Sequence, residues 1–253
     1  EYTFNGTATN DGTGAGLDLT LVMSGVSPVY STGVNDLGQA LYFSALNGGH
    51  SAAAMTSGNA TALNGANAVT ITGWLKVDSA DTYVGLERVL ATADNFSSGG
   101  LVLGYYGAAN GADKGKLQFG IGSPGTGFYS SPSYATANTW LFFALTWINQ
   151  VAQPANNLSF YVGTESTSVA LVNTTTSPDG LSVIPTQGNK LAVGNRPGLA
   201  RGFDGALDDV RIYTSTNGEV LDAAALESIR LMPEPALLLP LLMCSFRFKV
   251  ERC

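Results

Sequence analysis

The pattern that most constrains the fold is a series of short strand-forming runs along the first 230 residues of the chain. Runs rich in Val, Ile, Thr, Tyr and Phe alternate with clusters of Gly, Asn, Asp, Ser and Pro, which favour turns. This pattern is typical of an all-β sandwich made of two antiparallel sheets. We expect strands at residues 17–23, 40–46, 68–77, 86–93, 101–106, 116–121, 140–148, 157–163, 168–172, 190–194 and 203–213.

One segment has helical rather than strand periodicity. Leu221, Ala225, Leu226 and Ile229 recur at the spacing of one helix face, and Asp222 is placed to cap the first turn. We therefore expect a single short helix at residues 222–230.

The composition excludes several classes of function. The chain has 12 Lys and Arg against 19 Asp and Glu, so nucleic acid is not an expected partner. His50 is the only histidine, which restricts any Ser-His-Asp triad to that ring. Both cysteines, Cys244 and Cys253, lie in the last ten positions, so the core is expected to form without disulfides. These two cysteines could pair with each other or between chains.

Residues 231–253 differ in character from the rest of the chain. A Pro-Glu-Pro box at 233–235 is followed by an apolar run at 236–244 and by a basic end with Arg247, Lys249 and Arg252. This order resembles the PEP-CTERM sorting signal of bacterial surface proteins, which implies recognition by an exosortase and export. Pro240 interrupts the run, which is shorter than the ~20 residues that span a bilayer, so no permanent membrane span is expected.

The expected organisation is a domain at 1–230 followed by a tail at 231–253. The sequence starts at Glu1 rather than Met, as it would after removal of a signal peptide, so we expect a secreted or cell-surface protein. The alternative for the tail is an ordinary hydrophobic segment that packs on the domain.

Several short motifs occur together in a characteristic order. They are YTFNG at 2–6, NDGTGAG at 10–16, GQALYF at 38–43, VTITGWLK at 69–76, WLFFALTW at 140–147, LAVG at 191–194 and FDGALDDVRIY at 203–213. The ordered set resembles the laminin-G-like branch of the concanavalin A-like jelly rolls. The resemblance implies a two-sheet jelly roll that serves as a carbohydrate-binding, adhesive or spacer module.

The same resemblance implies a structural calcium ion between an early loop and the last strand. The matching positions are Asp11 and Asp208, with Asp18 as an additional ligand. Calcium takes about 6–8 oxygen ligands, which a Gly-rich acidic loop can supply. The alternative is that these carboxylates only form turns and surface, without a metal.

Aromatic side chains on loop rims are the expected glycan-binding groups, because a tyrosine ring offers a rigid stacking surface. Trp74 and Trp147 lie within apolar runs and are expected in the core. The candidate loop aromatics are Tyr105, Tyr106, Phe128, Tyr129 and Tyr134. The alternative is that these tyrosines cover sheet edges.

The run at 140–148 is apolar on both faces, whereas a sandwich strand with one exposed face should alternate. Its outer face therefore needs a cover, which is either a segment of the same chain or a neighbouring subunit. On the second reading, self-association would involve the outer face of this strand and the tail, namely Phe142, Ile148, Leu237, Leu238, Leu239, Leu241, Leu242 and Phe246.

Catalysis is not expected, although the superfamily includes glucanases. These enzymes need two carboxylates about 5–5.5 Å or about 6.5–9.5 Å apart. Glu87 stands alone in its strand, and simple alternation places Asp208 and Asp209 on opposite faces of the last strand.

Two hypotheses follow from the sequence. In the first, the chain is a non-catalytic structural subunit of a self-associating extracellular fibre or layer, stabilised by its apolar tail. In the second, it is a carbohydrate-binding module that recognises a polysaccharide through loop aromatics, with calcium as a stiffening cofactor.

Overall fold

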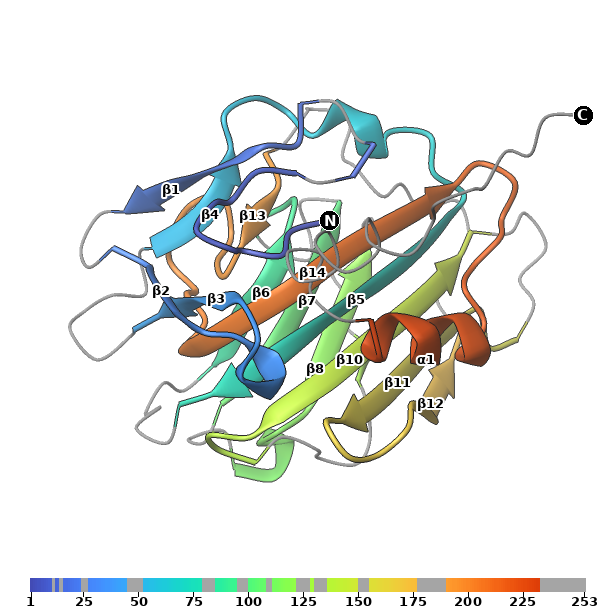
Figure 1. Ribbon diagram of the computed structural model, residues 1–253. Coiled ribbons are helices and arrows are strands. Elements are labelled where there is room, and N and C mark those ends of the chain that lie inside the picture. Colours follow the sequence, from blue (N-terminus) through green and yellow to red (C-terminus); the bar gives the residue numbers. More distant parts are fainter. Residues whose placement is uncertain are drawn as a thin grey trace, which may run out of the picture.

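The computed structural model describes residues 1–10, 12–13, 16–23, 27–44, 52–78, 85–94, 100–107, 111–121, 128–129, 136–149, 155–176 and 190–232. Over these residues the chain forms two stacked antiparallel sheets with one α-helix, α1, on the outer face of one of them (Figure 1). This confirms the predicted two-sheet jelly-roll sandwich.

The first sheet has seven strands, and their order across the sheet differs from their order in the chain. In spatial order they are β1 (Leu19–Met23), β4 (Ala52–Thr56), β13 (Ala192–Val193), β6 (Leu86–Ala91), β7 (Leu101–Tyr106), β8 (Leu117–Ile121) and β9 (Phe128–Tyr129).

The second sheet, which carries α1 and is called the α1 sheet below, also has seven strands. In spatial order they are β12 (Ala170–Thr175), β11 (Leu158–Thr164), β10 (Trp140–Ile148), β5 (Ala68–Val77), β14 (Gly205–Ser215), β3 (Gln39–Phe43) and β2 (Val29–Thr32). The helical elements are α1 (Ala223–Arg230) and the short 3-10 turns η1 (Val34–Asp36), η2 (Thr61–Leu63) and η4 (Gly111–Asp113).

The strands at 68–77, 101–106 and 140–148 have the predicted bounds, and the other predicted strands are present with shifted ends. Sequence reasoning missed β2, β4 and β9. Strand β4 has the sequence AAAMT, and alanine has a low intrinsic preference for strands. All five of its residues are buried, so packing rather than propensity determines its conformation.

The main hydrophobic core lies between the sheets, where Trp147, Phe143 and Phe119 are fully buried. A second cluster lies on the outer face of the α1 sheet and includes Trp74. The rings of Trp74 and Phe142 meet edge-on, with centroids 5.3 Å apart. Both tryptophans that were expected in the core are therefore buried.

Helix α1 covers the apolar outer face of β10 and β5. Leu226 and Ile229 of the helix pack in one cluster with Phe142, and Phe142 is 0% exposed. The prediction that Phe142 lies in a contact between subunits is wrong, because a helix of the same chain buries it. Asp222 caps the helix as expected, since its side chain accepts a hydrogen bond from the Ala225 amide at 2.8 Å. Ile148, at the end of β10, is half-buried.

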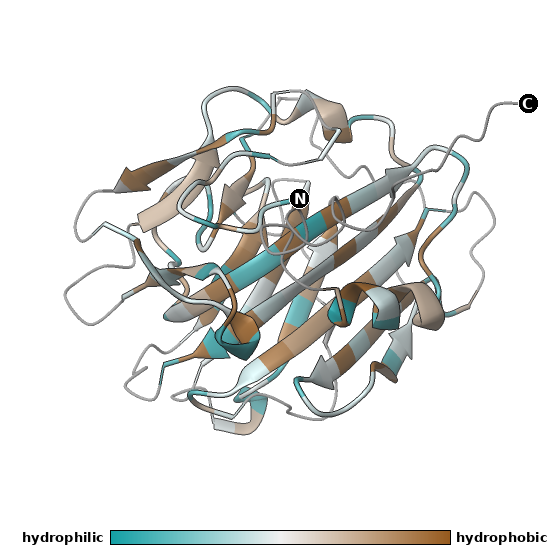
Figure 2. Cartoon of the chain, in the orientation of Figure 1, coloured by the Kyte–Doolittle hydropathy of each residue, from teal (hydrophilic) through white to brown (hydrophobic). Residues whose placement is uncertain are grey.

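A β-bulge changes the facing of residues in β14. The pairing with β5 shifts between Asp208 and Arg211, and Asp209 has a positive φ of 47°. As a result Leu207 and Val210 both face the main core. The predicted regular alternation is therefore wrong beyond Asp208, and Figure 2 shows the hydrophilic stretch that β14 carries there.

Among the described residues, no helix has the length and the apolar character needed to cross a bilayer.

Gly205 provides a test of the packing between β14 and β5. It has a φ of 143°, and a Cβ at this position would overlap the carbonyl oxygen of Lys76. We expect Gly205→Ala to lower the free energy of unfolding by about 2 kcal/mol or more, because a backbone atom cannot move aside. Urea denaturation measures this loss.

Gly58→Ala is the matched control. No atom lies within 4 Å of a Cβ at Gly58, so this change should stay within about 0.5 kcal/mol of the original stability. Equal losses for the two variants would contradict the argument.

Candidate functional site

Two hollows lie beside β14. The larger one, called the N-terminal hollow below, has a volume of about 380 Å³ and lies between the first residues of the chain, η2 and the end of β14. It is lined by Glu1, Tyr2, Asn10, Gly12, Thr13, Leu17, Ala62, Leu63, Ile212, Tyr213 and Thr214. The lining therefore comes from three segments that are far apart in the sequence.

The N-terminal hollow combines an apolar floor with polar walls. Tyr2, Leu17 and Leu63 belong to the main core, and the Tyr2 hydroxyl donates to the Leu17 carbonyl at 2.8 Å. Burial raises the pKa of the Tyr2 hydroxyl, and the nearby charge of Asp18 adds to this, so Tyr2 stays protonated at neutral pH. The floor is thus fixed by packing and by a buried hydrogen bond.

Asn10 organises the loop that forms one wall of this hollow. Its Oδ1 atom accepts the Gly12 amide at 3.0 Å, as in a turn closed by an Asn side chain. The Asn10 amide in turn donates to the Asp18 carboxylate at 3.0 Å. These bonds hold the polar wall against the end of β14.

A buried ion pair lines the second hollow and contacts Glu1, which lines the N-terminal hollow. The Arg211 guanidinium donates to both carboxylate oxygens of Asp209, at 2.8 and 2.9 Å, and lies 3.2 Å from the Glu1 carboxylate. Burial raises the pKa of the Asp209 carboxyl, and the charge of Arg211 opposes this rise. The bulge in β14 places this pair on the outer side of the sheet with Trp74, because it turns Val210 toward the main core.

The second hollow, called the α1 hollow, has a volume of about 130 Å³. The Glu165 side chain accepts the Asn35 amide at 3.1 Å on one side of it, and Arg211 Nη1 contacts Met232 Sδ at 3.3 Å on another. Its lining residues are Val34, Asn35, Leu37, Trp74, Glu165, Asp209, Arg211, Arg230, Leu231 and Met232. Its charged groups contact other residues of the domain. We therefore interpret this hollow as a place where elements of the fold are joined.

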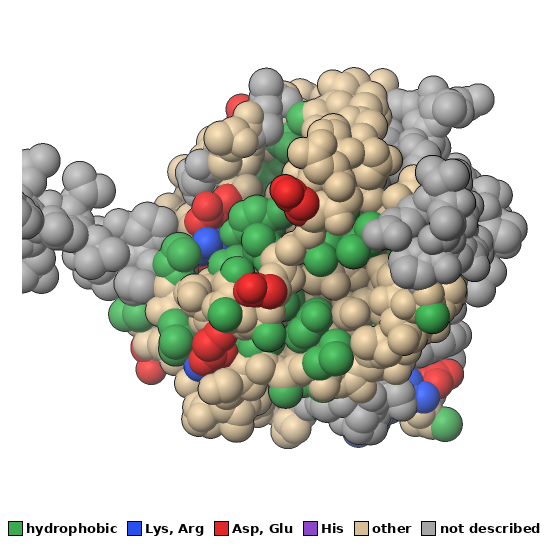
Figure 3. All heavy atoms as spheres, turned by 90° about the vertical axis from the view of Figure 1, so that its right-hand side faces the viewer, with side chains coloured by type: hydrophobic (Ala, Val, Ile, Leu, Met, Phe, Trp, Pro, Cys, Tyr) green, Lys and Arg blue, Asp and Glu red, His purple; other side chains and the backbone are tan. Residues whose placement is uncertain are grey.

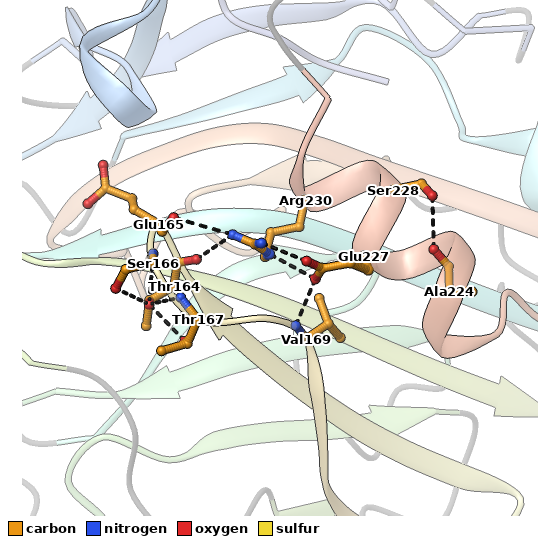
Figure 4. A network of polar contacts seen from close by, with 9 residues as sticks. All are labelled: Thr164, Glu165, Ser166, Thr167, Val169, Ala224, Glu227, Ser228 and Arg230. Carbon is orange, nitrogen blue, oxygen red and sulfur yellow. Dashed lines mark hydrogen bonds and ion pairs between the residues drawn. The ribbon is translucent and has the colours of Figure 1, made fainter.

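The end of α1 is fastened to the turn between β11 and β12 (Figure 4). Arg230 donates to both carboxylate oxygens of Glu227, at 2.9 and 2.6 Å, and to the Thr164 carbonyl at 2.7 Å. Glu227 also accepts the Val169 amide at 2.8 Å. We call this network the Arg230 clamp; it holds the helix in place over the outer cluster.

The surface beside α1 carries little positive charge. Figure 3, which shows the side at the right of Figure 1, displays many hydrophobic side chains, isolated acidic groups and few Lys or Arg side chains. Only 12% of the residues in the whole chain are charged. Such a surface offers little long-range attraction for polyanions.

The structure separates the aromatic residues that were expected to bind glycans. Tyr105 is only 2% exposed, and its ring meets Phe203 edge-on inside the core, so its assignment to a glycan-binding rim is wrong. Tyr106 is half-buried, and its hydroxyl donates to Gln118 at 3.2 Å. Phe128 and Tyr129 form β9, but their side chains lie outside the described part of the structure, as does Tyr134.

The expected calcium ligands are not seen together. Asp208 is fully buried, and its two oxygens accept the amides of Val34 and Asp209, so it organises backbone. Asp18 is exposed and accepts the Asn10 amide, and Asp11 lies outside the described residues. Within the described ranges no three His, Cys, Asp or Glu side chains are grouped as metal ligands. Calcium binding stays a prediction.

The carboxylates relevant to catalysis lie inside the protein. Glu87 is 0% exposed, and its Oε2 atom accepts the Asp204 amide at 2.8 Å. Asp204 is 1% exposed. Through this hydrogen bond Glu87 holds the segment that leads into β14.

The tail residues Leu237, Leu238, Leu239, Leu241, Leu242 and Phe246, together with Cys244 and Cys253, lie outside the described residues. Sequence reasoning did not find Thr13, Tyr213 or Thr214 as site residues. No local motif marks them, since they become neighbours only when the N-terminal segment pairs with β14 through Tyr2 and Val210.

The jelly roll and its polar surface hollow place the chain among lectin-like sandwich domains. The Concanavalin A-like lectin/glucanases superfamily matches residues 47–218, and the chain belongs to this superfamily in its laminin-G group. No curated protein matches the chain at a significant level.

Solved structures with the same fold share little sequence with this chain. A botulinum neurotoxin type C structure, described by its interaction with two ganglioside molecules, aligns with a TM-score of 0.55 and 10% identity, over 88% of this chain and 50% of that one. This chain thus spans half of the neurotoxin chain. A Ruminococcus gnavus sialidase module, CBM40, aligns with a TM-score of 0.48 and 12% identity, over 70% and 93% of the two chains.

A pH titration tests the Arg230 clamp. The hydrogen bonds from Arg230 and the Val169 amide lower the pKa of Glu227 from its usual 4.5 to about 2. Because the pKa is depressed in the folded state, the carboxylate stabilises the fold above pH 4.5, and this contribution is lost as the pH falls toward 2. We expect Glu227→Gln to cost about 0.5–1 kcal/mol at neutral pH, since the pair is partly exposed.

Urea denaturation at neutral and at acid pH measures this effect, and the cost should shrink at the acid end. The exposed Glu219, which lies just before α1, provides Glu219→Gln as the control. A loss for Glu227→Gln that is the same at both pH values would contradict the assigned role of its charge.

Proposed function

We propose that this chain is a non-catalytic, extracellular carbohydrate-binding module whose site is the N-terminal hollow. The observation that carries the proposal is this hollow of about 380 Å³, with its apolar floor and polar walls. Membership of a superfamily of lectins and glucanases supports a carbohydrate ligand. The neurotoxin structure of the same fold, which is described by its ganglioside interaction, supports it as well.

The lining suits a hydroxyl-rich ligand. Leu17 and Leu63 offer an apolar surface for the C–H face of a sugar ring, while Thr13 and Thr214 bring hydroxyl groups. The volume falls within the range of about 300–1,000 Å³ that is usual for small-molecule sites. One or two sugar units would fill it, and a longer chain would extend into solvent.

The charge of the lining favours a neutral glycan. Glu1 is the only charged side chain among the described residues that line this hollow. The α-ammonium of the same residue donates to Asn10 Oδ1 at 3.0 Å, and Arg211, which lies 3.2 Å from the Glu1 carboxylate, is held by two hydrogen bonds to Asp209. The positive and negative groups of Glu1 offset each other, so the lining is close to neutral overall and suits a neutral glycan.

We favour carbohydrate binding over the hypothesis that copies of the chain form a fibre through contacts on the outer face of β10. That hypothesis required Phe142 to be available to a neighbour, and α1 covers Phe142. The burial of Glu87 and Asp204 supports a non-catalytic role.

Glycan binding is tested with a broad array of neutral and anionic polysaccharides, followed by titration calorimetry on any binder. Thr214→Val keeps the side-chain shape and removes a hydroxyl that lines the hollow. We expect about tenfold weaker binding, since one lost hydrogen bond is worth roughly 1–1.5 kcal/mol. Thr136→Val changes an exposed threonine before β10 and should have no effect.

The outcome discriminates between sites. If binding survives Thr214→Val but is lost in Tyr129→Ala, the glycan site lies at the loop aromatics instead. If no polysaccharide binds, the proposed function is wrong.

Calcium as a stiffening cofactor is a separate proposal for Asp11, Asp18 and Asp208. If it binds, calcium should raise the melting temperature and a chelator should lower it, by several degrees at saturating metal. Asp11→Asn should remove the difference, whereas Asp113→Asn, in η4, should leave it intact. Identical melting curves with calcium and with chelator would rule the ion out.

A further inference from the structure

Exposed hydrophobic side chains lie on both edge strands of the α1 sheet, as the described residues define it. Large hydrophobic side chains of the described residues are strongly exposed at four positions only, with Val29 at 53%, Leu171 at 54%, Leu231 at 62% and Met232 at 49%. Leu231 and Met232 follow α1. Val29 lies on β2 and Leu171 on β12, and these strands are the two opposite edges of one sheet.

The two edges present the same face of the sheet. Val29 pairs with Tyr42, and Leu171 pairs with Tyr161. Both tyrosines pack against the outer cluster under α1, so Val29 and Leu171 lie on the outer face as well. If β2 of one copy pairs with β12 of another, the outer face continues across the junction and these two side chains become cross-strand neighbours.

The two edge strands lack the charged side chains that guard many exposed edges, although β2 is short and directly follows Pro28. Edge strands of soluble proteins are commonly guarded by Lys, by inward charges or by Pro. Strand β2 reads VYST and strand β12 reads ALVNTT, so neither contains a charge or a proline. By contrast, at the edges of the first sheet, β9 is only two residues long and Leu19 of β1 is buried.

We propose that β2 of one copy of this chain adds to β12 of a second copy, so that the α1 sheets join head to tail into a filament. A second copy is the fitting partner because each chain carries both halves of the contact, with an uncharged strand and one exposed hydrophobic side chain on each. An interface between opposite edges is heterologous, so it leaves one edge free on each end copy and generates assemblies larger than a dimer, here a filament because the sheets are joined edge to edge in one direction.

The contact is short, which defines its strength and geometry. Strand β2 has four residues, and the bulge in the β11–β12 pairing interrupts the regular register near Leu171. Such a contact gives weak, concentration-dependent association. Each copy inserts seven strands, so the repeat along the filament is expected to be about 34 Å, at about 4.8 Å per strand.

Sedimentation velocity of the full chain over a wide concentration range, with electron microscopy of the concentrated sample, tests the proposal. The unchanged chain should grow into species larger than dimers. Val29→Lys or Leu171→Lys should each abolish this growth, because a lysine on an edge strand opposes pairing. Both positions are more than half exposed, so the variants should keep the original melting temperature.

Mixing the two variants gives the sharpest result. The intact β12 of the Val29→Lys chain can pair with the intact β2 of the Leu171→Lys chain, so the mixture should form dimers and nothing larger. Leu231→Lys changes an equally exposed side chain away from the edges and should leave the assembly intact.

Three results would overturn the proposal. One is a chain that stays monomeric at all concentrations. Another is loss of assembly in Leu231→Lys, which would assign the contact to the region after α1. The third is a dimer that depends on Leu171 but not on Val29, which would show symmetric pairing of two β12 strands. These measurements contain no glycan, so they are independent of the proposed carbohydrate site.

Discussion

The structure depends on a sheet that is apolar on both faces and on the helix that covers its outer side. Strands β5 and β10 place Trp147 and Phe143 in the main core, and Trp74 and Phe142 beneath α1. Without a cover, the second set would be exposed to water. The apolar stripe of α1 supplies it, and the Arg230 clamp fixes the end of the helix to the same sheet. The apolar centre of the outer face is thereby covered, and the described part of the surface offers the hollows beside β14 and the sheet edges.

One extra residue in β14 links this scaffold to the candidate site. The bulge at Asp209 places the buried Asp209–Arg211 pair on the outer side of the sheet, where both residues line the α1 hollow, and Arg211 also lies 3.2 Å from the carboxylate of Glu1, which lines the N-terminal hollow. In a regular strand, residues two apart share a face, so Asp209 and Arg211 would have followed Leu207 toward the main core, whereas the bulge places them on the outer side with Trp74. The α1 hollow therefore owes its charged lining to backbone geometry as much as to composition.

Much of the fold is predictable from the sequence, and the reason is periodicity. The strands at 68–77 and 140–148 are long apolar runs, and Asp222 followed by a helical stripe marks α1. The features that the sequence did not predict have physical causes. The alanines of β4 form a strand because of their packing. The order of polar and apolar residues in β14 does not predict its bulge. Tyr105 turns into the core at the end of its strand. The hollow joins Asn10, Leu63 and Thr214, whose proximity arises only from tertiary pairing.

The central position of β5 also determines the order in which the chain can fold. Its neighbours are β10 and β14, and its register with β14 joins Val69 to Thr214, far apart along the chain. The middle of the α1 sheet therefore cannot close until nearly the whole domain is available, and the helix that covers it comes later still. Such non-local pairing is slow, typically on a scale of ~milliseconds to seconds. During synthesis, the chain could thus not form its native sheet until the domain was almost complete.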